Sequence, residues 1–164
     1  MVRLAARVAL ETCEAGVAVL TGAHAELVAA AVADLPIALV HHPGWRAGLG
    51  STLRAAIDAA PACQGLLVLA CDQPGVAPDG VAALAEAWRR DPERPAAASY
   101  ADILGVPAIL PLPAARRAEF PAERGAQAWL EAWAGGASAV ALPAAADDVD
   151  TPEELAQLES GGNR

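Results

Sequence analysis

The chain has 164 residues, 55% of which are hydrophobic, and a formal net charge of −9. This length and apolar content favour one domain with a sizeable core and exclude a largely disordered chain. Lysine is absent, and an acidic surface without a basic patch argues against a nucleic-acid partner. No run is long and apolar enough to span a membrane, and Arg7 and Glu11 interrupt any signal-peptide core. We therefore expect a cytoplasmic protein.

The cysteines Cys13, Cys63 and Cys71 are odd in number and form no C-x-x-C pair. Buried, small hydrophobic side chains in a reducing compartment are favoured over a redox or metal role by about four to one.

Short apolar runs alternate with helical patterns along most of the chain. In chain order, the patterns predict a helix over residues 2–14, a strand over 17–20, a helix over 23–34, a strand over 37–40, a glycine-rich loop over 41–50, a helix over 51–59 with Ser51 as its N-cap, a strand over 65–70, a helix over 78–90, strands over 96–100 and 106–110, helices over 114–119 and 125–133, a strand over 137–142 and a helix over 152–158.

This alternation of fully apolar strands and helices predicts an α/β fold of three layers, α/β/α. The sheet is expected to be mostly parallel, with helices on both of its faces. No internal repeat is visible, so we expect residues 1–164 to form a single domain, with a frayed tail over 160–164.

Asp72 is the first polar residue after the apolar run that begins at Gly65, and Pro74 and Gly75 then turn the chain. In open α/β sheets, ligands bind outside the carboxyl ends of the strands, where Asp72 is expected to lie. A carboxylate there is costly unless something pairs with it. A turn-forming aspartate and a metal ligand are about equally well supported by position alone.

A second acidic segment, residues 147–154, is explained in part by helix capping. Thr151 at the N-cap, Pro152 at the first helical position and Glu154 two residues later form a capping box. These three residues therefore need no functional explanation.

Asp148 and Asp150 are not explained by the capping box. On an extended segment their side chains point the same way, and two like charges so close repel each other unless a cation lies between them. Together with Asp72 they would offer oxygen ligands to Mg²⁺, which also takes water and substrate phosphates as ligands. Surface acids that favour a helix N-terminus remain the alternative, preferred by about two to one before other evidence.

The glycine-rich segment before the helix at Ser51 is the third candidate site. A loop such as Gly48-Leu49-Gly50-Ser51 at a helix N-terminus can approach an anion or a nucleotide closely. It matches only the first half of G-x-G-x-x-G, so it is weak evidence for a Rossmann site. Arg54 lies one turn further on, where a solvated position is favoured over a phosphate contact by about two to one.

The order of these motifs resembles the MobA-like nucleotidyltransferases, and most closely their molybdenum cofactor cytidylyltransferase branch. The matching segments, which extend over nearly the whole chain, are Gly22-Ala23-His24, Pro43 with Trp45, Gly48-Leu49-Gly50-Ser51, Asp72-Gln73-Pro74, Leu104-Gly105-Val106-Pro107-Ala108, Glu123-Arg124-Gly125-Ala126 and Asp148-Val149-Asp150-Thr151-Pro152-Glu153-Glu154-Leu155.

The resemblance implies a Rossmann-like nucleotidyltransferase fold. It also implies transfer of a nucleoside monophosphate from a nucleoside triphosphate to the phosphate of molybdopterin cofactor, with release of pyrophosphate. The closer match favours CTP as the nucleotide, and GTP remains the alternative. Asp72 and Asp150 would then hold Mg²⁺ with help from Asp148, and Gly48, Gly50 and Ser51 would lie near the nucleotide. A molybdoenzyme or its chaperone would be the protein partner.

The family also has a first strand and loop of the form L-A-A-G-x-S-x-R-x-G-x-x-K, which cradles the triphosphate, and this sequence contains no match to it. We therefore expect an N-terminally shortened version, produced by a start codon placed too far downstream, and the DNA read in frame upstream of Met1 tests this. Without that strand, apolar strand edges would be left unpaired or neighbouring strands would close up. The alternative is a non-catalytic binding or assembly module that keeps the fold and has lost the triphosphate site.

Overall fold

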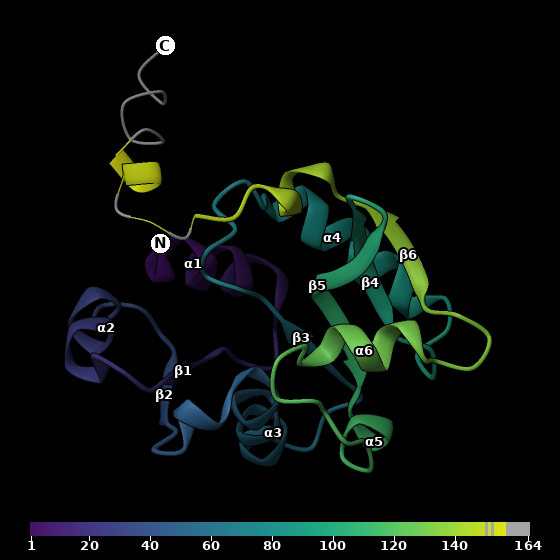
Figure 1. Cartoon of the computed structure of the whole chain (residues 1–164), viewed down its shortest axis with the longest axis horizontal. Helices are drawn as coiled ribbons and strands as arrows, with labels where there is room; N and C mark the ends of the chain where they lie inside the picture. The colour runs from purple at the N-terminus through teal and green to yellow at the C-terminus, as the bar shows by residue number, and fades with distance from the viewer. Residues whose placement is uncertain (150, 152, 157–164) are drawn as a thin grey trace.

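The computed structural model describes residues 1–149, 151 and 153–156. Its elements, in chain order, are α1 (Val2–Thr12), β1 (Ala18–Thr21), α2 (Ala25–Ala31), β2 (Ala38–His41), the 3₁₀ helix η1 (Trp45–Ala47), α3 (Leu49–Ala59), β3 (Gly65–Val68), α4 (Pro78–Arg89), β4 (Ala96–Tyr100), β5 (Ile103–Pro111), α5 (Leu112–Ala115), α6 (Ala126–Glu131), β6 (Ser138–Ala141) and the 3₁₀ helix η2 (Pro143–Ala146) (Figure 1). Residues 153–156 are helical, whereas the rest of the helix expected over 152–158 and the tail over 160–164 lie outside the described residues.

The predicted α/β class is confirmed, and the strand directions are more mixed than expected. Four strands form one sheet in the order β3-β5-β4-β6, in which β5 runs antiparallel to both of its neighbours and β4 runs parallel to β6. β4 and β5 are joined by a tight turn at Ala101 and Asp102, which both have positive φ angles, 46° and 61°. A turn this short can join only antiparallel strands, which accounts for the reversed strand.

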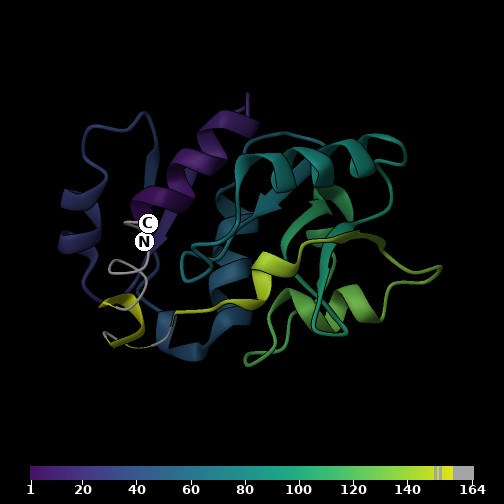
Figure 2. The same ribbon diagram turned by 90° about the horizontal axis from the view of Figure 1, so that it is seen from above.

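Helices cover both faces of this sheet, which gives the three expected layers (Figure 2). On one face, Ala97, Ala108 and Leu110 pack against Leu53 and Ile57 of α3 and against residues of α5 and α6. On the opposite face, Ala96 and Ile109 pack against Leu84 and Ala85 of α4. Successive strand residues point to opposite faces, so the run of alanines in β4 serves both layers. We call these four strands with α3, α4, α5 and α6 the sheet body.

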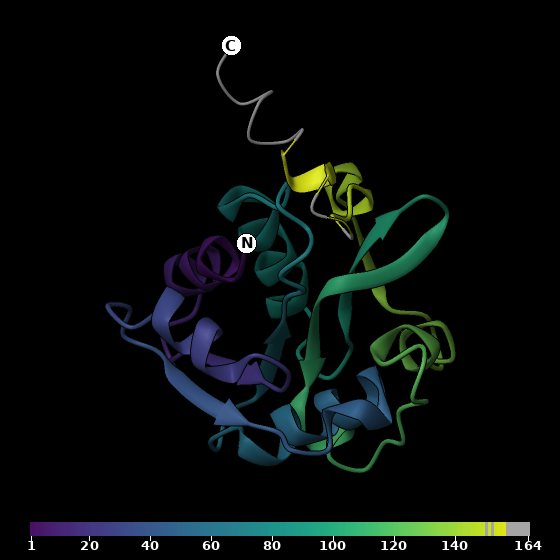
Figure 3. The same cartoon turned by 60° about the vertical axis from the view of Figure 1, so that its left-hand side comes forward.

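The remaining strands form a second, separate sheet. β1 and β2 pair in parallel, and among the described residues neither pairs with a strand of the sheet body. The strands are therefore divided between two sheets, and neighbouring strands have not closed up into one. We call β1, α2 and β2, residues 18–41, the edge unit (Figure 3).

The edge unit is packed much less tightly than the sheet body. Within residues 18–41 only Thr21 and Val32 are buried, and the α2 side chain of Leu27 is 71% exposed. Polar contacts attach the unit to α1: Arg3 forms an ion pair with Asp34 and donates a hydrogen bond of 3.1 Å to the carbonyl oxygen of Ala31.

The pairing of β4 with β5 contains a bulge. Ala97 pairs with Ala108, but the next β4 residue, Ala98, pairs with Gly105. Val106 and Pro107 are therefore extra residues on the β5 side. Such bulges re-aim the side chains beside them, and this one lies three residues before the end of β4.

Among the described residues, no helix has both the length and the apolar character needed to cross a membrane.

Candidate functional site

The carboxyl ends of three strands meet at one edge of the sheet body. β3 and β4 are each antiparallel to β5, so they are parallel to each other, and β6 is parallel to β4. Asp72 follows β3, Tyr100 ends β4, and Asp148 follows β6 by way of η2. Asp72 therefore lies at the carboxyl end of a strand, as predicted from the sequence.

A backbone hydrogen bond joins the two acidic segments at this edge. The N–H of Val149 donates to the carbonyl oxygen of Asp72 at 2.8 Å, which brings the preceding residue, Asp148, beside the Asp72 turn. Asp72 is half-buried and Asp148 is exposed. We call Asp72 and Asp148 the carboxylate pair. The third predicted ligand, Asp150, lies outside the described residues.

Tyr100 lies beside the carboxylate pair and was not singled out from the sequence. Burial raises the pKa of its hydroxyl, the hydrogen bond from Gln73 opposes this shift, and the charges of Asp148 and Asp72 add to it. The hydrogen bond from Gln73, which directly follows Asp72, places the phenol next to the Asp72 turn. The sequence feature that could have identified Tyr100 is its position as the last residue of the expected strand 96–100, at the carboxyl edge of the sheet.

Gln73 ties the three strand ends together. Its side chain is 7% exposed, and its Nε2 donates to the carbonyl oxygen of Ala145 at 2.8 Å and to the hydroxyl of Tyr100 at 3.3 Å. Its Oε1 is buried and has no hydrogen-bond partner among the described residues. The amide therefore links the Asp72 turn to β4 and η2, and it still offers one acceptor.

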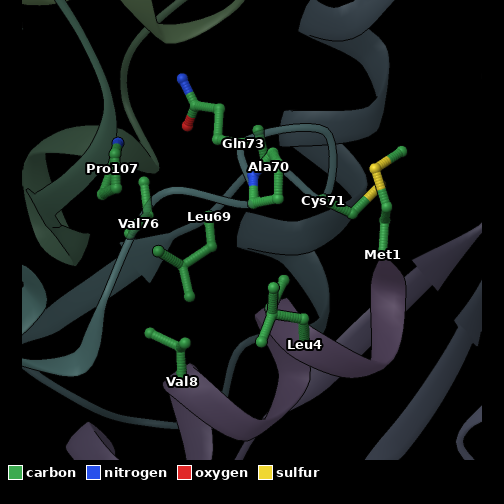
Figure 4. Close-up of a pocket in the computed structure, with 11 residues that line it drawn as sticks. Met1, Leu4, Val8, Leu69, Ala70, Cys71, Gln73, Val76 and Pro107 are labelled. Carbon is green, nitrogen blue, oxygen red and sulfur yellow. The ribbon is translucent and has the colours of Figure 1, made fainter. Parts of the chain in front are cut away.

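A small pocket of about 10 Å³ adjoins Gln73, between α1 and the end of β3 (Figure 4). Such a volume is about one water-sized probe, so one water molecule fits. Its apolar walls include Leu4, Val8 and Leu69.

The cysteine beside Asp72 does not offer a ready metal ligand. Desolvation by the surrounding protein raises the pKa of the Cys71 thiol even though the residue is exposed at the surface, and the charge of Asp72 raises it further, so the thiol stays protonated at neutral pH. Cys13 and Cys63 are half-buried and Cys71 is exposed, so the expectation of three buried cysteines was wrong for Cys71, which lies in the turn after β3.

The capping box is confirmed by its two reciprocal hydrogen bonds. The N–H of Glu154 donates to Thr151 Oγ1 at 3.2 Å, and the N–H of Thr151 donates to Glu154 Oε2 at 3.0 Å. Pro152 lies outside the described residues. The side chains of Thr151 and Glu154 therefore cap the helix, as expected.

The glycine loop is shaped by a close approach of another segment. A Cβ on Gly48, whose φ is 98°, would lie 2.6 Å from the carbonyl oxygen of Ala122, and one on Gly50 would lie 2.6 Å from that of Pro121. The N–H of Gly50 donates to the carbonyl oxygen of Ala122 at 3.2 Å. Packing against residues 120–122 is thus enough to require both glycines.

Ser51 is not the N-cap of α3, which begins two residues earlier, so that expectation was wrong. Gly48 holds the N-cap position with a positive φ of 98°, a conformation that favours glycine, and the helix starts at Leu49. Ser51 Oγ donates to the carbonyl oxygen of Gly48 at 2.8 Å and lies 3.0 Å from Nε2 of His42.

Arg54 is half-buried, and its guanidinium contacts other parts of the chain. Its guanidinium donates to the carbonyl oxygens of Arg116, at 3.3 Å, and Ala118, and it lies 5.6 Å from the ring centre of Phe120. It therefore holds the segment that packs on the glycine loop. An open hollow of about 420 Å³ lies here, lined in part by Ser51, Arg54 and Phe120.

The carboxylate pair and the glycine loop occupy different parts of the molecule. In Figures 1 and 3 the segment that follows β6 runs along the top, whereas α3 lies at the bottom. The structure thus brings Asp72 and Asp148 together and places Gly48, Gly50 and Ser51 elsewhere, against residues 120–122.

The carboxylate pair fits a hard divalent cation. Two carboxylates on adjoining segments supply oxygen donors, and Mg²⁺ or Mn²⁺ takes few protein ligands and completes its shell with water and phosphate. Within residues 1–149, 151 and 153–156, no group of three His, Cys, Asp or Glu side chains is close enough to hold a metal by itself. A metal at this site would therefore depend on water and substrate for its remaining ligands.

Known proteins share this sequence pattern and this fold. The family model described as "MobA-like NTP transferase domain" matches residues 1–141. The fold is similar to that of Rv0371c from Mycobacterium tuberculosis H37Rv, with 20% identity over 97% of this chain and 82% of that one, at a TM-score of 0.76. A manganese complex of Rv0371c matches with 20% identity over 96% of this chain and 84% of that one, at a TM-score of 0.71.

A structure titled as a nucleotidyl transferase, Mth528 from Methanothermobacter thermautotroptrophicus, has 17% identity over 98% of this chain and 79% of that one, at a TM-score of 0.80. No curated protein matches the sequence. At these identities, the solved structures support the fold alone.

Proposed function

This chain belongs to the MobA-like NTP transferase family, and from that premise we propose that it transfers a nucleoside monophosphate from CTP to the phosphate of molybdopterin cofactor, with release of pyrophosphate. The observation that carries the proposal is the junction of Asp72 and Asp148 at the carboxyl edge of the sheet body, held by the hydrogen bond from Val149. A nucleotidyl transfer needs such a cation site because its substrates are polyanions and the chain itself is acidic.

In this proposal Asp72, Asp148 and Asp150 hold Mg²⁺. The bound cation would neutralise phosphate charge and polarise the phosphorus that is attacked. The protein's part is to keep the carboxylates in place before the substrate arrives. Val149 does this through the backbone of Asp72, and Gln73 does it by tying the turn to η2.

We place the nucleoside end of CTP at the glycine loop, with Gly48, Gly50 and Ser51 as its contacts. The support is the hollow of about 420 Å³ beside Ser51, in which Phe120 offers an aromatic wall. The distance of this loop from the carboxylate pair requires that a bound nucleotide extend between the two parts, as a triphosphate does when its base and its phosphates are held separately.

A second candidate function is a non-catalytic binding or assembly module for a molybdopterin-type ligand, with a molybdoenzyme or its chaperone as partner in the cytoplasm. The divided sheet favours it, because the position between the edge unit and the sheet body is where the family's loop-bearing strand would run.

Isothermal titration with CTP and Mg²⁺ separates these functions. The transferase predicts magnesium-dependent CTP binding, whereas the module predicts binding of a pterin or a partner protein without CTP. We expect Asp72→Asn to weaken magnesium-dependent binding on the order of 100-fold, since changes in the outer shell alone cost roughly 10–100-fold.

Asp91→Asn is the matched control, because it removes an exposed carboxylate that lies beyond the far end of α4, one helix length away from the Asp72 turn. Unchanged binding in Asp72→Asn, or equal losses in both variants, would show that the carboxylate pair does not hold the metal.

A further inference from the structure

The hydrogen-bond donors at the start of α3 are used within the protein. The N–H of Gly50 donates to the carbonyl oxygen of Ala122 at 3.2 Å, and the N–H of Ser51 donates to that of Gly48 at 3.1 Å. An anion at a helix N-terminus binds through such N–H groups. The glycine loop therefore offers a phosphate fewer donors than its sequence suggests.

The hydroxyl proton of Ser51 is also directed at the backbone. Ser51 Oγ lies 2.8 Å from the carbonyl oxygen of Gly48 and 3.4 Å from that of Gly44, and carbonyl oxygens only accept, so the single O–H donates there. Nε2 of His42 lies 3.0 Å from the same Oγ, so this nitrogen carries a hydrogen and donates it to the serine. The lone pair that remains on Oγ can only accept a hydrogen bond.

The hollow of about 420 Å³ beside this serine has balanced charges. Its lining includes Ser51, Arg54, Glu119 and Phe120. The carboxylate of Glu119 offsets the positive charge of Arg54, and Oδ1 of Asp58 lies 3.9 Å from Nη1 of the same arginine. The lining residues therefore supply no excess of positive charge that would attract a phosphate.

We propose that Ser51 Oγ accepts a hydrogen bond from the nucleoside end of the nucleotide, and that this contact selects a ligand with a donor group at that point. The donor is an N–H or O–H group, which the 4-amino group of cytosine and the hydroxyl groups of ribose both offer. This inference rests on the proposed function, because it requires that the hollow take the nucleoside end of CTP.

The test is isothermal titration of the full chain, in the presence of Mg²⁺, with CTP, UTP and 2′,3′-dideoxy-CTP. UTP lacks the 4-amino group, and the dideoxy analogue lacks the free ribose hydroxyls. We expect the wild type to bind CTP roughly 10-fold more tightly than one of these analogues, as one hydrogen bond of ordinary net strength accounts for. A preference over UTP identifies the amino group as the donor, and a preference over the dideoxy analogue identifies a ribose hydroxyl. Ser51→Ala should abolish that preference.

Thr52→Val is the matched control. It removes a hydroxyl that donates to the same carbonyl oxygen of Gly48, at 3.5 Å, from a residue outside the lining of the hollow. This variant should keep the preference of the wild type. Pyrophosphate with Mg²⁺ has no nucleoside, so it should bind the wild type and Ser51→Ala equally.

The outcomes separate this inference from the function on which it rests. A wild type that binds all three nucleotides equally, or a preference that survives in Ser51→Ala, would overturn the inference and leave the proposed function standing. Equal loss of the preference in Thr52→Val would overturn it as well, because the start of the helix rather than the acceptor would then be responsible. Weaker pyrophosphate binding in Ser51→Ala would show that Ser51 contacts the phosphates instead. Failure of the wild type to bind CTP would overturn the proposed function and the inference together.

Discussion

The sheet body and the edge unit are both made of apolar strands and alanine-rich helices, yet they are stabilised in different ways. In the sheet body, Ala96, Ala97 and Leu110 have no exposed surface, and helices cover both faces. In the edge unit, α2 has no buried residue, and an ion pair from α1 holds its end. An apolar strand therefore contributes to stability only where a neighbouring layer covers it.

This difference decides where a functional site can be held rigidly. The carboxylate pair, Tyr100 and Gln73 all belong to the sheet body or to segments anchored on it. The edge unit can open at a low free-energy cost, because few apolar contacts would be lost. A site formed by residues of both the edge unit and the sheet body would be well ordered only when a bound ligand contacts both.

Truncating a buried leucine should change stability more than any other substitution considered, and an exposed leucine provides the comparison. Leu110→Ala removes a fully buried side chain and should lower the free energy of unfolding by roughly 2–5 kcal/mol, the usual cost of a buried leucine. Leu27→Ala makes the same chemical change in α2, where the side chain is 71% exposed, and should stay within about 0.5 kcal/mol. Urea unfolding of both variants measures this, and similar losses would mean that the two regions are equally well packed.

A smaller effect is expected at the junction of the two regions, where α3 follows the edge unit and packs on the sheet body. In Gly50→Ala the new methyl group would meet the backbone carbonyl oxygens of Phe120 and Pro121, which have little room to move. We expect a loss of roughly 1–3 kcal/mol in thermal or urea unfolding, as for other overpacked sites.

Gly80→Ala is the control for this change, because its methyl group would meet only the flexible end of Leu142. This variant should be neutral or slightly stabilised, since alanine is the better helix former. Equal destabilisation of both variants would contradict the role given to residues 120–122.

The smallest effect concerns the ion pair at the edge unit. The hydrogen bond from Arg3 lowers the pKa of Asp34 to about 2. Because the folded pKa is lowered, the contribution of this pair is complete above the usual aspartate pKa near 3.8 and is lost as the pH falls toward 2. An NMR titration of the Asp34 carboxyl should show a pKa of about 2 in the wild type and a return to the usual aspartate range in Arg3→Gln.

Amide hydrogen exchange in Arg3→Gln then shows which region of the molecule depends on the ion pair. Faster exchange in α2 than in the wild type, with β4 unchanged, is the expected result, since both residues of the pair are well exposed and only the edge unit depends on it. Faster exchange throughout the chain would contradict the independence of the two regions.

Much of the site could be predicted because it depends on local patterns. An apolar run that ends in Asp72 must place that carboxylate at a strand end, and Thr151 and Glu154 form a capping box by spacing alone. The proximity of Asp148 to Asp72 followed from the rule that parallel strands end at one edge.

The other contacts could not be predicted because they join residues far apart in the chain. Arg54 donates to carbonyl groups more than 60 residues away, and Gln73 reaches Ala145 over 72 positions. The start of α3 was misplaced because a serine one turn into a helix can bond to the backbone of the preceding turn just as an N-cap serine can. The reversed β5 was missed because its turn has Ala101 where glycine or asparagine is usual.

The bulge between β4 and β5 limits how this hairpin can change in length during evolution. From the pair Ala97 and Ala108 to the pair Ala98 and Gly105, β4 advances one residue and β5 advances three, so the two extra residues leave the alternation of side chains intact. A deletion of one residue there would turn every β5 side chain before it to the opposite face and move Gly105 from beneath Tyr100. Related sequences should therefore gain or lose residues at this position in pairs.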